Sequence, residues 1–227
     1  MCSFLINVKE VSSIVKNWYK SYINENHSFD KTTIIGIFAL IVVIAGMFGF
    51  LYELIFYYFN EGMKYFYWRG GNFLPWINIY AIGAIMIYFL TYKFRKSPFK
   101  VFLISIISTG VLELIGGAGM YIIGDGFRCW DYNTEILNFG NIGGFVCLRS
   151  VLIFGIFGLL LIYLVVPILF FIASKMNKRL FLIISISICA LFLIDEIYNL
   201  VIARLLSTPR ASDVYKELGL RYVSFKS

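Results

Sequence analysis

Residues 32–52 read TTIIGIFALIVVIAGMFGFLY and contain no charged side chain between Lys31 and Glu53. An α-helix needs about 20 predominantly apolar residues to cross the hydrocarbon core of a bilayer. The 21 residues of this interval meet that requirement. We therefore predict a transmembrane helix in this stretch.

The composition of the whole chain agrees with a membrane protein. Hydrophobic residues make up 60% of the 227 residues, charged residues make up 15%, and the mean hydropathy is +0.81. Soluble domains are roughly 45–50% apolar and about 25% charged, and disordered chains are poorer still in apolar residues. Both classes are excluded. The aromatic share of 19% is typical of side chains that anchor helices at the membrane interface.

Four further stretches are long and almost free of charge, so we predict an all-α polytopic bundle of about five transmembrane helices over residues 31–204. Residues 1–30 form an N-terminal arm in this prediction, and residues 205–227 form a C-terminal tail. The four stretches lie between Arg69 and Lys93, Lys100 and Asp125, Arg149 and Lys175, and Arg179 and Arg204.

The distribution of Lys and Arg predicts the orientation of the bundle. Eleven lie in the arm and in the connections after the second and fourth spans, and four lie in the opposite loops. Cytoplasmic loops carry the excess of Lys and Arg, so we predict a cytoplasmic N-terminus. The tail carries five more and falls on the other side. The formal charge of +7 is thus explained by membrane topology, without a nucleic-acid partner.

The arm has the pattern of an amphipathic helix. Apolar residues recur at spacings of three and four, with lysines and serines between them, which is typical of a helix lying on a membrane surface. We expect it to lie on the cytoplasmic face. The apolar residues are Phe4, Val8, Val11, Val15, Trp18 and Tyr22.

Ionisable residues fall inside or at the ends of the predicted spans, where an unpaired charge costs several kcal/mol. Small or hydroxylated residues share a helix face with several of them, which favours inward placement. Ala39, Gly46 and Gly49 share a face with Glu53; Ser105, Thr109, Gly117 and Tyr121 share one with Glu113; and Ser185, Cys189 and Asn199 share one with Glu196, which leaves Asp195 about 100 degrees away. Two interpretations stay open: a polar cavity that binds a substrate, or buried ion pairs that hold the helices together. A proton relay is a third. We expect Glu113 or Glu53 to pair with Arg149 or Arg69. The candidate residues are Glu53, Arg69, Glu113, Arg149, Asp195 and Glu196.

Several chemistries have no support in the sequence. The chain contains no GxxxxGK[ST], HExxH or GxSxG motif, and its single histidine, His27, precedes the first span. We predict no metal site and no cofactor, because the cysteines form no CxxC pair. Cys129 and Cys147 flank one loop; a disulfide and two unpaired thiols are the alternatives.

A series of motifs in matching order resembles the bacterial membrane family called ABC-transporter type IV, or CmpB-like, over roughly residues 50–196. Where the family tends to read RGxxxGPxCPxYGxG, this chain has Leu74, Ile77, Asn78 and Ala81 in place of a glycine, a cysteine, a proline and a glycine. The residues that carry the resemblance, besides Glu53, Arg69, Glu113 and Asp195, are Gly70, Pro75, Tyr80, Gly83, Trp130, Asp131, Tyr132, Asn138, Cys147 and Leu148.

The resemblance implies a multi-pass plasma-membrane protein that acts as a permease or as a transporter-associated subunit. A separate ATP-binding subunit would then supply the energy, since the chain has no P-loop of its own. Two alternatives belong to other classes: a structural or regulatory membrane protein, and a membrane-embedded enzyme acting on lipid head groups through Asp131 and the carboxylates. We expect no enzymatic activity. The expected partners are the lipid bilayer and the ATP-binding subunit, and a homo-oligomer stays open.

Overall fold

The computed structural model describes residues 16–23, 30–64, 66–126 and 128–219. The described part of the chain is 75% helix and contains no strand beyond an isolated bridge between Ile142 and Val146. The prediction of an all-α membrane bundle is confirmed.

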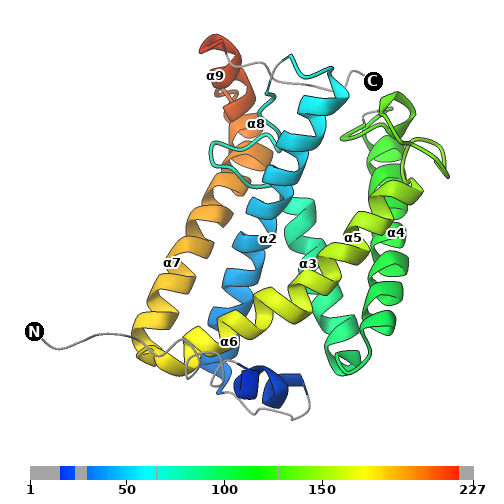
Figure 1. The fold of residues 1–227 in the computed structure, drawn as a ribbon. Helices are drawn as coiled ribbons and strands as arrows, with labels where there is room; N and C mark the ends of the chain where they lie inside the picture. The colour runs from blue at the N-terminus through cyan, green and yellow to red at the C-terminus, as the bar shows by residue number, and fades with distance from the viewer. Residues whose placement is uncertain (1–15, 24–29, 65, 127, 220–227) are drawn as a thin grey trace, which may run out of the picture.

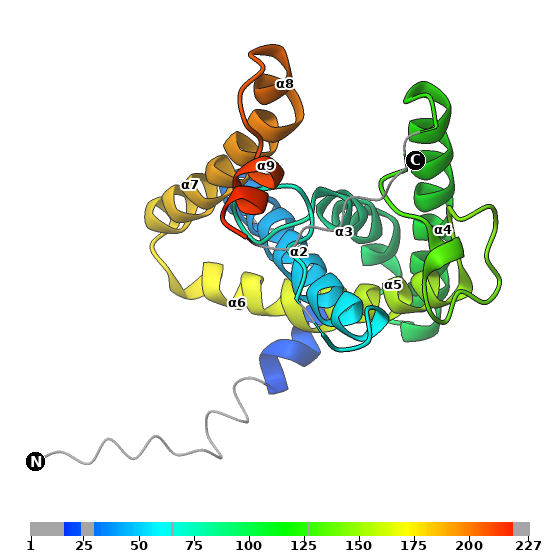
Figure 2. The ribbon, with the colours of Figure 1, turned by 90° about the horizontal axis from the view of Figure 1, so that it is seen from above.

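The helices cross the bundle in alternating directions, and α2 lies at its centre against α7, α3 and α6 (Figures 1 and 2). Short 3-10 turns and two π-helices interrupt or join the α-helices. The elements are α2 (Lys31–Asn60), α3 (Asn78–Thr91), η1 (Tyr92–Phe94), α4 (Pro98–Ile123), η2 (Tyr132–Thr134), α5 (Leu148–Leu160), η3 (Leu161–Val165), α6 (Val166–Lys175), α7 (Lys178–Ile197), η4 (Tyr198–Ile202), α8 (Ala203–Leu205) and α9 (Ala211–Glu217).

Four helical segments are long and apolar enough to cross a membrane, and the second predicted crossing is shorter. The long segments are residues 31–60, 98–123, 148–175 and 178–205, and the shorter apolar helix covers residues 78–94. The charge-free interval after Arg69 begins with a non-helical segment, residues 66–77, which contains Pro75. The interval is therefore long enough for a span, but α3 occupies only its second half.

Small residues let the central helix approach its neighbours closely. Gly46 lies against Trp76 and Phe192, and its carbonyl accepts a hydrogen bond from the backbone N–H of Ile77 at 3.1 Å. Gly49 lies against the ring of Tyr80. A side chain at either position would push α3 and residues 66–77 away from α2. The predicted inward placement of these glycines is confirmed by their burial.

The described part of the predicted arm, residues 16–23, is helical and packs against the bundle. Tyr22 is fully buried, and its hydroxyl donates to the carbonyl of Ile162 at 3.0 Å. Trp18 stacks on Tyr22 and meets the edge of Phe171. The helix is therefore anchored to protein through its aromatic face. The other apolar positions of the predicted amphipathic pattern, Phe4 to Val15, lie outside the described residues.

The two ends of the bundle differ sharply in charge. The end that contains residues 16–23, 92–100 and 175–179 is named the basic end, because it holds ten described Lys and Arg and one described acid, Asp30. The other ten described acids and seven Lys and Arg lie in the half toward the opposite end, named the acidic end, where residues 61–77, 124–147 and α9 are located. The cations of the basic end are Lys16, Lys20, Lys31, Lys93, Arg95, Lys96, Lys100, Lys175, Lys178 and Arg179.

Candidate functional site

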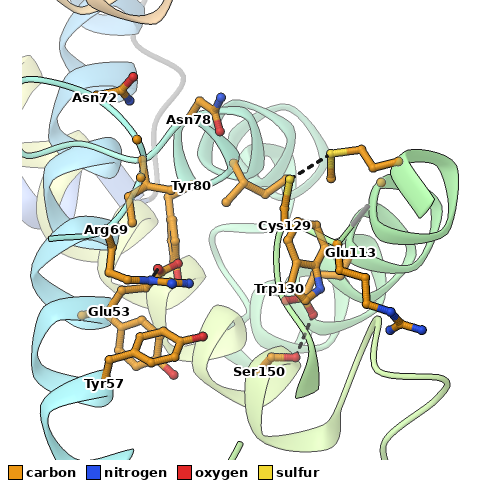
Figure 3. A pocket seen from close by; sticks show the side chains of 18 of the residues that line it. Glu53, Tyr57, Arg69, Asn72, Asn78, Tyr80, Glu113, Cys129, Trp130 and Ser150 are labelled. Carbon is orange, nitrogen blue, oxygen red and sulfur yellow. Dashed lines mark hydrogen bonds and ion pairs between the residues drawn. The ribbon is translucent and has the colours of Figure 1, made fainter. Parts of the chain in front are cut away.

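A cavity of about 620 Å³ lies at the acidic end of the bundle. Its walls come from α2, α3, α4, α5, α8, α9 and the loops that join them. Figure 3 shows Glu53, Tyr57 and Arg69 on one wall, and Glu113, Cys129 and Trp130 on the other. Polar side chains from distant parts of the sequence thus surround one space.

One wall is built by a chain of paired charges. Glu53, in the last third of α2, accepts a hydrogen bond from Nε of Arg69 at 2.9 Å, so one predicted pairing is confirmed. The Arg69 guanidinium lies over the ring of Tyr57, 4.0 Å from its centroid. The Tyr57 hydroxyl in turn donates to Glu135. This wall therefore links α2 to both loops of the acidic end.

Glu135 also binds Arg149, at the start of α5. The Nη2 atom of Arg149 lies 2.5 Å from Oε2 of Glu135, and both side chains are buried. Burial raises the pKa of Glu135 above its ordinary value of 4.5, while the hydrogen bonds from Tyr57 and Arg149 act in the opposite direction. The Arg149 guanidinium lies 4.0 Å from the ring centroid of Phe56. Its Nε is buried without a hydrogen-bond partner among the described residues.

Glu113 has hydroxyl partners instead of a cation. Tyr132 donates to its Oε1, and Ser150 donates to its Oε2 at 2.7 Å. None of the ion pairs formed by the described residues includes Glu113, so of the two acids expected to pair with an arginine, Glu53 is the one that does. Burial and the neighbouring Glu113 carboxylate raise the pKa of Tyr132 well above its usual value, which keeps that hydroxyl a donor.

The order of residues in α4 explains how Glu113 reaches the cavity. Ser105, Thr109 and Glu113 lie four apart and are all buried, as predicted for an inward face. Gly117 continues this face and lies against Trp130 and Phe145. Tyr121, predicted on the same face, is instead 41% exposed, because it lies in the last turn of the helix.

Asp195 and Glu196 do not line the cavity; they hold residues 72–78. The Asp195 carboxylate accepts the backbone N–H groups of Phe73 at 3.0 Å and of Leu74 at 2.8 Å. Glu196 accepts the side-chain amides of Asn72 at 2.7 Å and of Asn78 at 3.1 Å. Both acids thus satisfy polar groups of a non-helical segment packed against the bundle.

The remaining motif residues divide between the cavity wall and its supports. Gly70, Tyr80, Trp130 and Tyr132 line the cavity. Gly70 has a φ of +90°, and a Cβ there would lie 2.7 Å from the carbonyl oxygen of Trp76, so only glycine fits without strain. The cavity wall does not include Pro75, Gly83, Asn138, Cys147 or Asp131.

These other positions have local contacts. Asp131 pairs with Arg128 at 3.6 Å and accepts from Asn133, and Asn138 donates weakly to the carbonyl of Asn133. Cys147 is the residue preceding α5, and it is buried. Cys129 and Cys147 are both free thiols, so the disulfide alternative does not hold.

Sequence reasoning missed Glu135, Tyr57, Ser150, Asn72 and Asn78. Glu135 gave no signal because it lies in a predicted loop, where charge is ordinary. Asn78 had a weak signal: it stands where the resembled family tends to have proline, and its amide binds Glu196. No group of three or more possible ligand side chains for a metal occurs among the described residues.

This fold and cavity define an all-helical membrane protein with a polar site at one end. A family model described as "Putative ABC-transporter type IV" matches residues 38–200. The chain belongs to this family, and the predicted resemblance is confirmed. Comparisons with curated proteins and with solved structures found no match.

Proposed function

We propose that this chain is the membrane subunit of an ABC transporter in a bacterial plasma membrane, and that its cavity binds the transported substrate on the non-cytoplasmic side. The observation that carries the proposal is the cavity itself, walled by Glu53, Arg69, Glu113, Glu135 and Arg149. Buried ionisable groups in a membrane protein are expensive and commonly mark a ligand path.

The charge of the two ends supports this orientation. The ten described Lys and Arg of the basic end face a single described acid. The excess of Lys and Arg in short loops marks the cytoplasmic side. With the basic end in the cytoplasm, the cavity faces the opposite side of the membrane.

A separate ATP-binding subunit is part of the proposal and would dock at the basic end. The connections there are short: residues 95–97 join η1 to α4, and residues 176–177 join α6 to α7. The helix of residues 16–23 lies at the same end of the bundle (Figure 1). Exposed Lys96 and Lys100 lie close to the first connection and offer charge for recognising an acidic partner surface.

Affinity purification of the tagged protein from its native membranes in mild detergent, followed by mass spectrometry, tests the proposal. We expect a nucleotide-binding ATPase in stoichiometric amount. The variant Lys96→Glu/Lys100→Glu should lose it, whereas Lys64→Glu, an exposed lysine at the acidic end, should retain it. Recovery of the folded protein alone would contradict the proposal.

The proposal also treats the chain as a binding protein without catalytic activity. Incubation of the purified protein with a panel of phospholipids and isoprenoid lipids should leave every lipid unchanged by mass spectrometry. Turnover that is abolished by Glu113→Gln would favour the membrane-embedded enzyme instead.

A further inference from the structure

The polar cavity adjoins an apolar groove, and the stacked rings of Tyr80 and Phe154, 5.2 Å apart, form the wall between them. Tyr80 of α3 and Phe154 of α5 line both spaces. The groove has a volume of about 100 Å³ and runs toward the middle of the bundle between α2, α3 and η3. The groove therefore offers an apolar surface directly beside the polar cavity.

The groove opens toward the hydrocarbon of the membrane. Its lining is almost entirely apolar and includes Phe48, Leu160 and Leu164, which are 51%, 43% and 50% exposed. Exposed apolar side chains at the mid-depth of a membrane bundle face lipid chains. An acyl chain in the bilayer thus has direct access to the groove.

The cavity carries more positive than negative charge. Six of its lining residues are Lys or Arg, and three are Glu; the cations are Arg69, Arg128, Arg149, Arg204, Arg210 and Lys216. Two of the three glutamates, Glu53 and Glu135, are already paired with Arg69 and Arg149.

Two exposed cations at the mouth of the cavity are available to bind an anion. Arg204 and Lys216 are exposed and form no ion pair with any other described residue. Deeper in the wall, the N–H of Arg149 Nε has no acceptor among the described residues, although this side chain is more than nine-tenths buried. A buried donor without a partner is costly, and an anionic oxygen would satisfy it.

We propose that the ligand of the cavity is an anionic membrane lipid, with its phosphate among these cations and one chain in the apolar groove. The carboxylate of Glu113 accepts hydroxyls in the structure and would accept those of a polyol head group in the same way. The proposal rests on the proposed use of the cavity as a binding site, and it narrows the ligand to one chemical class.

Lipid binding to the full-length purified protein, measured by native mass spectrometry, tests the proposal. The probes are phosphatidylglycerol, phosphatidylcholine with the same chains, and glycerol phosphate, which shares the charged head but has no chain. We expect phosphatidylglycerol to bind about tenfold more tightly than phosphatidylcholine, because both lipids carry the phosphate but only choline adds a fixed positive charge, which Arg204 and Lys216 repel. Glycerol phosphate should compete weakly.

Two variants locate the binding. Arg204→Gln/Lys216→Gln should remove most of the preference for phosphatidylglycerol. Leu164→Trp fills the groove from its exposed side. It should lower the affinity for phosphatidylglycerol about fivefold, since the groove no longer accepts a chain. Ile168→Trp is the matched control, because this residue is 48% exposed but lies outside the groove. All variants are compared at equal thermal stability.

Three results would overturn the lipid proposal: equal binding of both phospholipids, full competition by glycerol phosphate, or phosphatidylglycerol binding that neither Arg204→Gln/Lys216→Gln nor Leu164→Trp weakens. Full competition by glycerol phosphate would assign the cavity to a soluble anion. The outcome is separable from the ATPase test, because lipid binding is measured without that partner. Loss of lipid preference with the ATPase still recovered would leave the transporter proposal standing.

Discussion

The basic and acidic ends of the bundle each bury an arginine, but they do so with different partners. At the basic end, Arg95 donates to the backbone carbonyls of Tyr22 and Tyr92 and lies 4.5 Å from the ring centroid of Tyr92. At the acidic end, Arg149 binds the carboxylate of Glu135. Backbone carbonyls remain in place when an arginine is removed and carry no net charge. A buried carboxylate carries a full negative charge when its arginine is removed. The stability of the acidic end therefore depends on its arginine far more strongly.

The largest effect is expected from Arg149→Gln. Removing one partner of a buried ion pair leaves an uncompensated charge and costs about 3–5 kcal/mol of unfolding free energy. Arg95→Gln at the basic end should cost about 1–3 kcal/mol, because the carbonyls of Tyr22 and Tyr92 that it leaves without this donor are neutral. Thermal unfolding in detergent measures both. The double variant Glu135→Gln/Arg149→Gln should recover part of the loss, and equal damage from all three variants would contradict the comparison.

A smaller effect is expected from Asp195→Ala. This substitution frees the N–H groups of Phe73 and Leu74 and should cost about 2–3 kcal/mol. The loss should appear first as faster hydrogen exchange in residues 70–77. Asp30→Ala at the basic end is the control, since its ion pair with Lys178 is largely exposed and should be worth little. Unchanged exchange in residues 70–77 would show that Asp195 does not hold this segment.

Glu113→Gln should cost only about 1 kcal/mol, because an amide oxygen still accepts one of the two hydroxyl donors. The measurement is again thermal unfolding, with Glu135→Gln beside it. The contrast separates a paired acid from an acid whose partners are neutral. A loss of unfolding free energy as large as that of Arg149→Gln would mean that Glu113 holds the helices together as the Glu135–Arg149 ion pair does.

The smallest expected effect is a change in how steeply the free energy of unfolding depends on pH. Burial raises the pKa of Glu135, so the folded protein holds this proton at pH values where the unfolded chain has released it. The contribution of Glu135 to stability is therefore full below pH 4.5 and is lost as the pH rises through its folded pKa. Glu135→Gln should flatten the unfolding free energy against pH in this range. A slope that remains unchanged would exclude Glu135 as its source.

The sequence was sufficient for the helical crossings and for the face of α4 that buries Glu113, because charge-free length and four-residue spacing are local properties. It also included the Glu53–Arg69 pair among the possible pairs of Glu53 or Glu113 with Arg69 or Arg149, because these residues were placed toward the same side of the membrane. It could not predict the short α3, since an interval without charge does not distinguish a helix from a non-helical segment buried in protein.

The same limit explains the missed partners at the cavity. Glu135 lies in a loop whose position no periodic pattern of residues predicts. It is 78 residues from Tyr57, and only tertiary folding brings it to Tyr57 and Arg149. Asp195 was predicted to lie about 100 degrees from the face of Glu196 by helix geometry. Both are buried, because residues 72–78 cover both positions.

The shortness of α3 has a consequence for the surrounding bilayer. Together with η1 it extends about 26 Å over residues 78–94, whereas the 26 residues of neighbouring α4 extend about 39 Å. Both helices present exposed apolar side chains, Ile82 and Phe89 on α3 and Ile107 and Ile115 on α4. The hydrophobic thickness of the membrane is about 30 Å, so lipids must thin beside one helix and thicken or tilt beside the other. We therefore expect the bilayer to be deformed unevenly around this protein, and lipid chain length to change its stability.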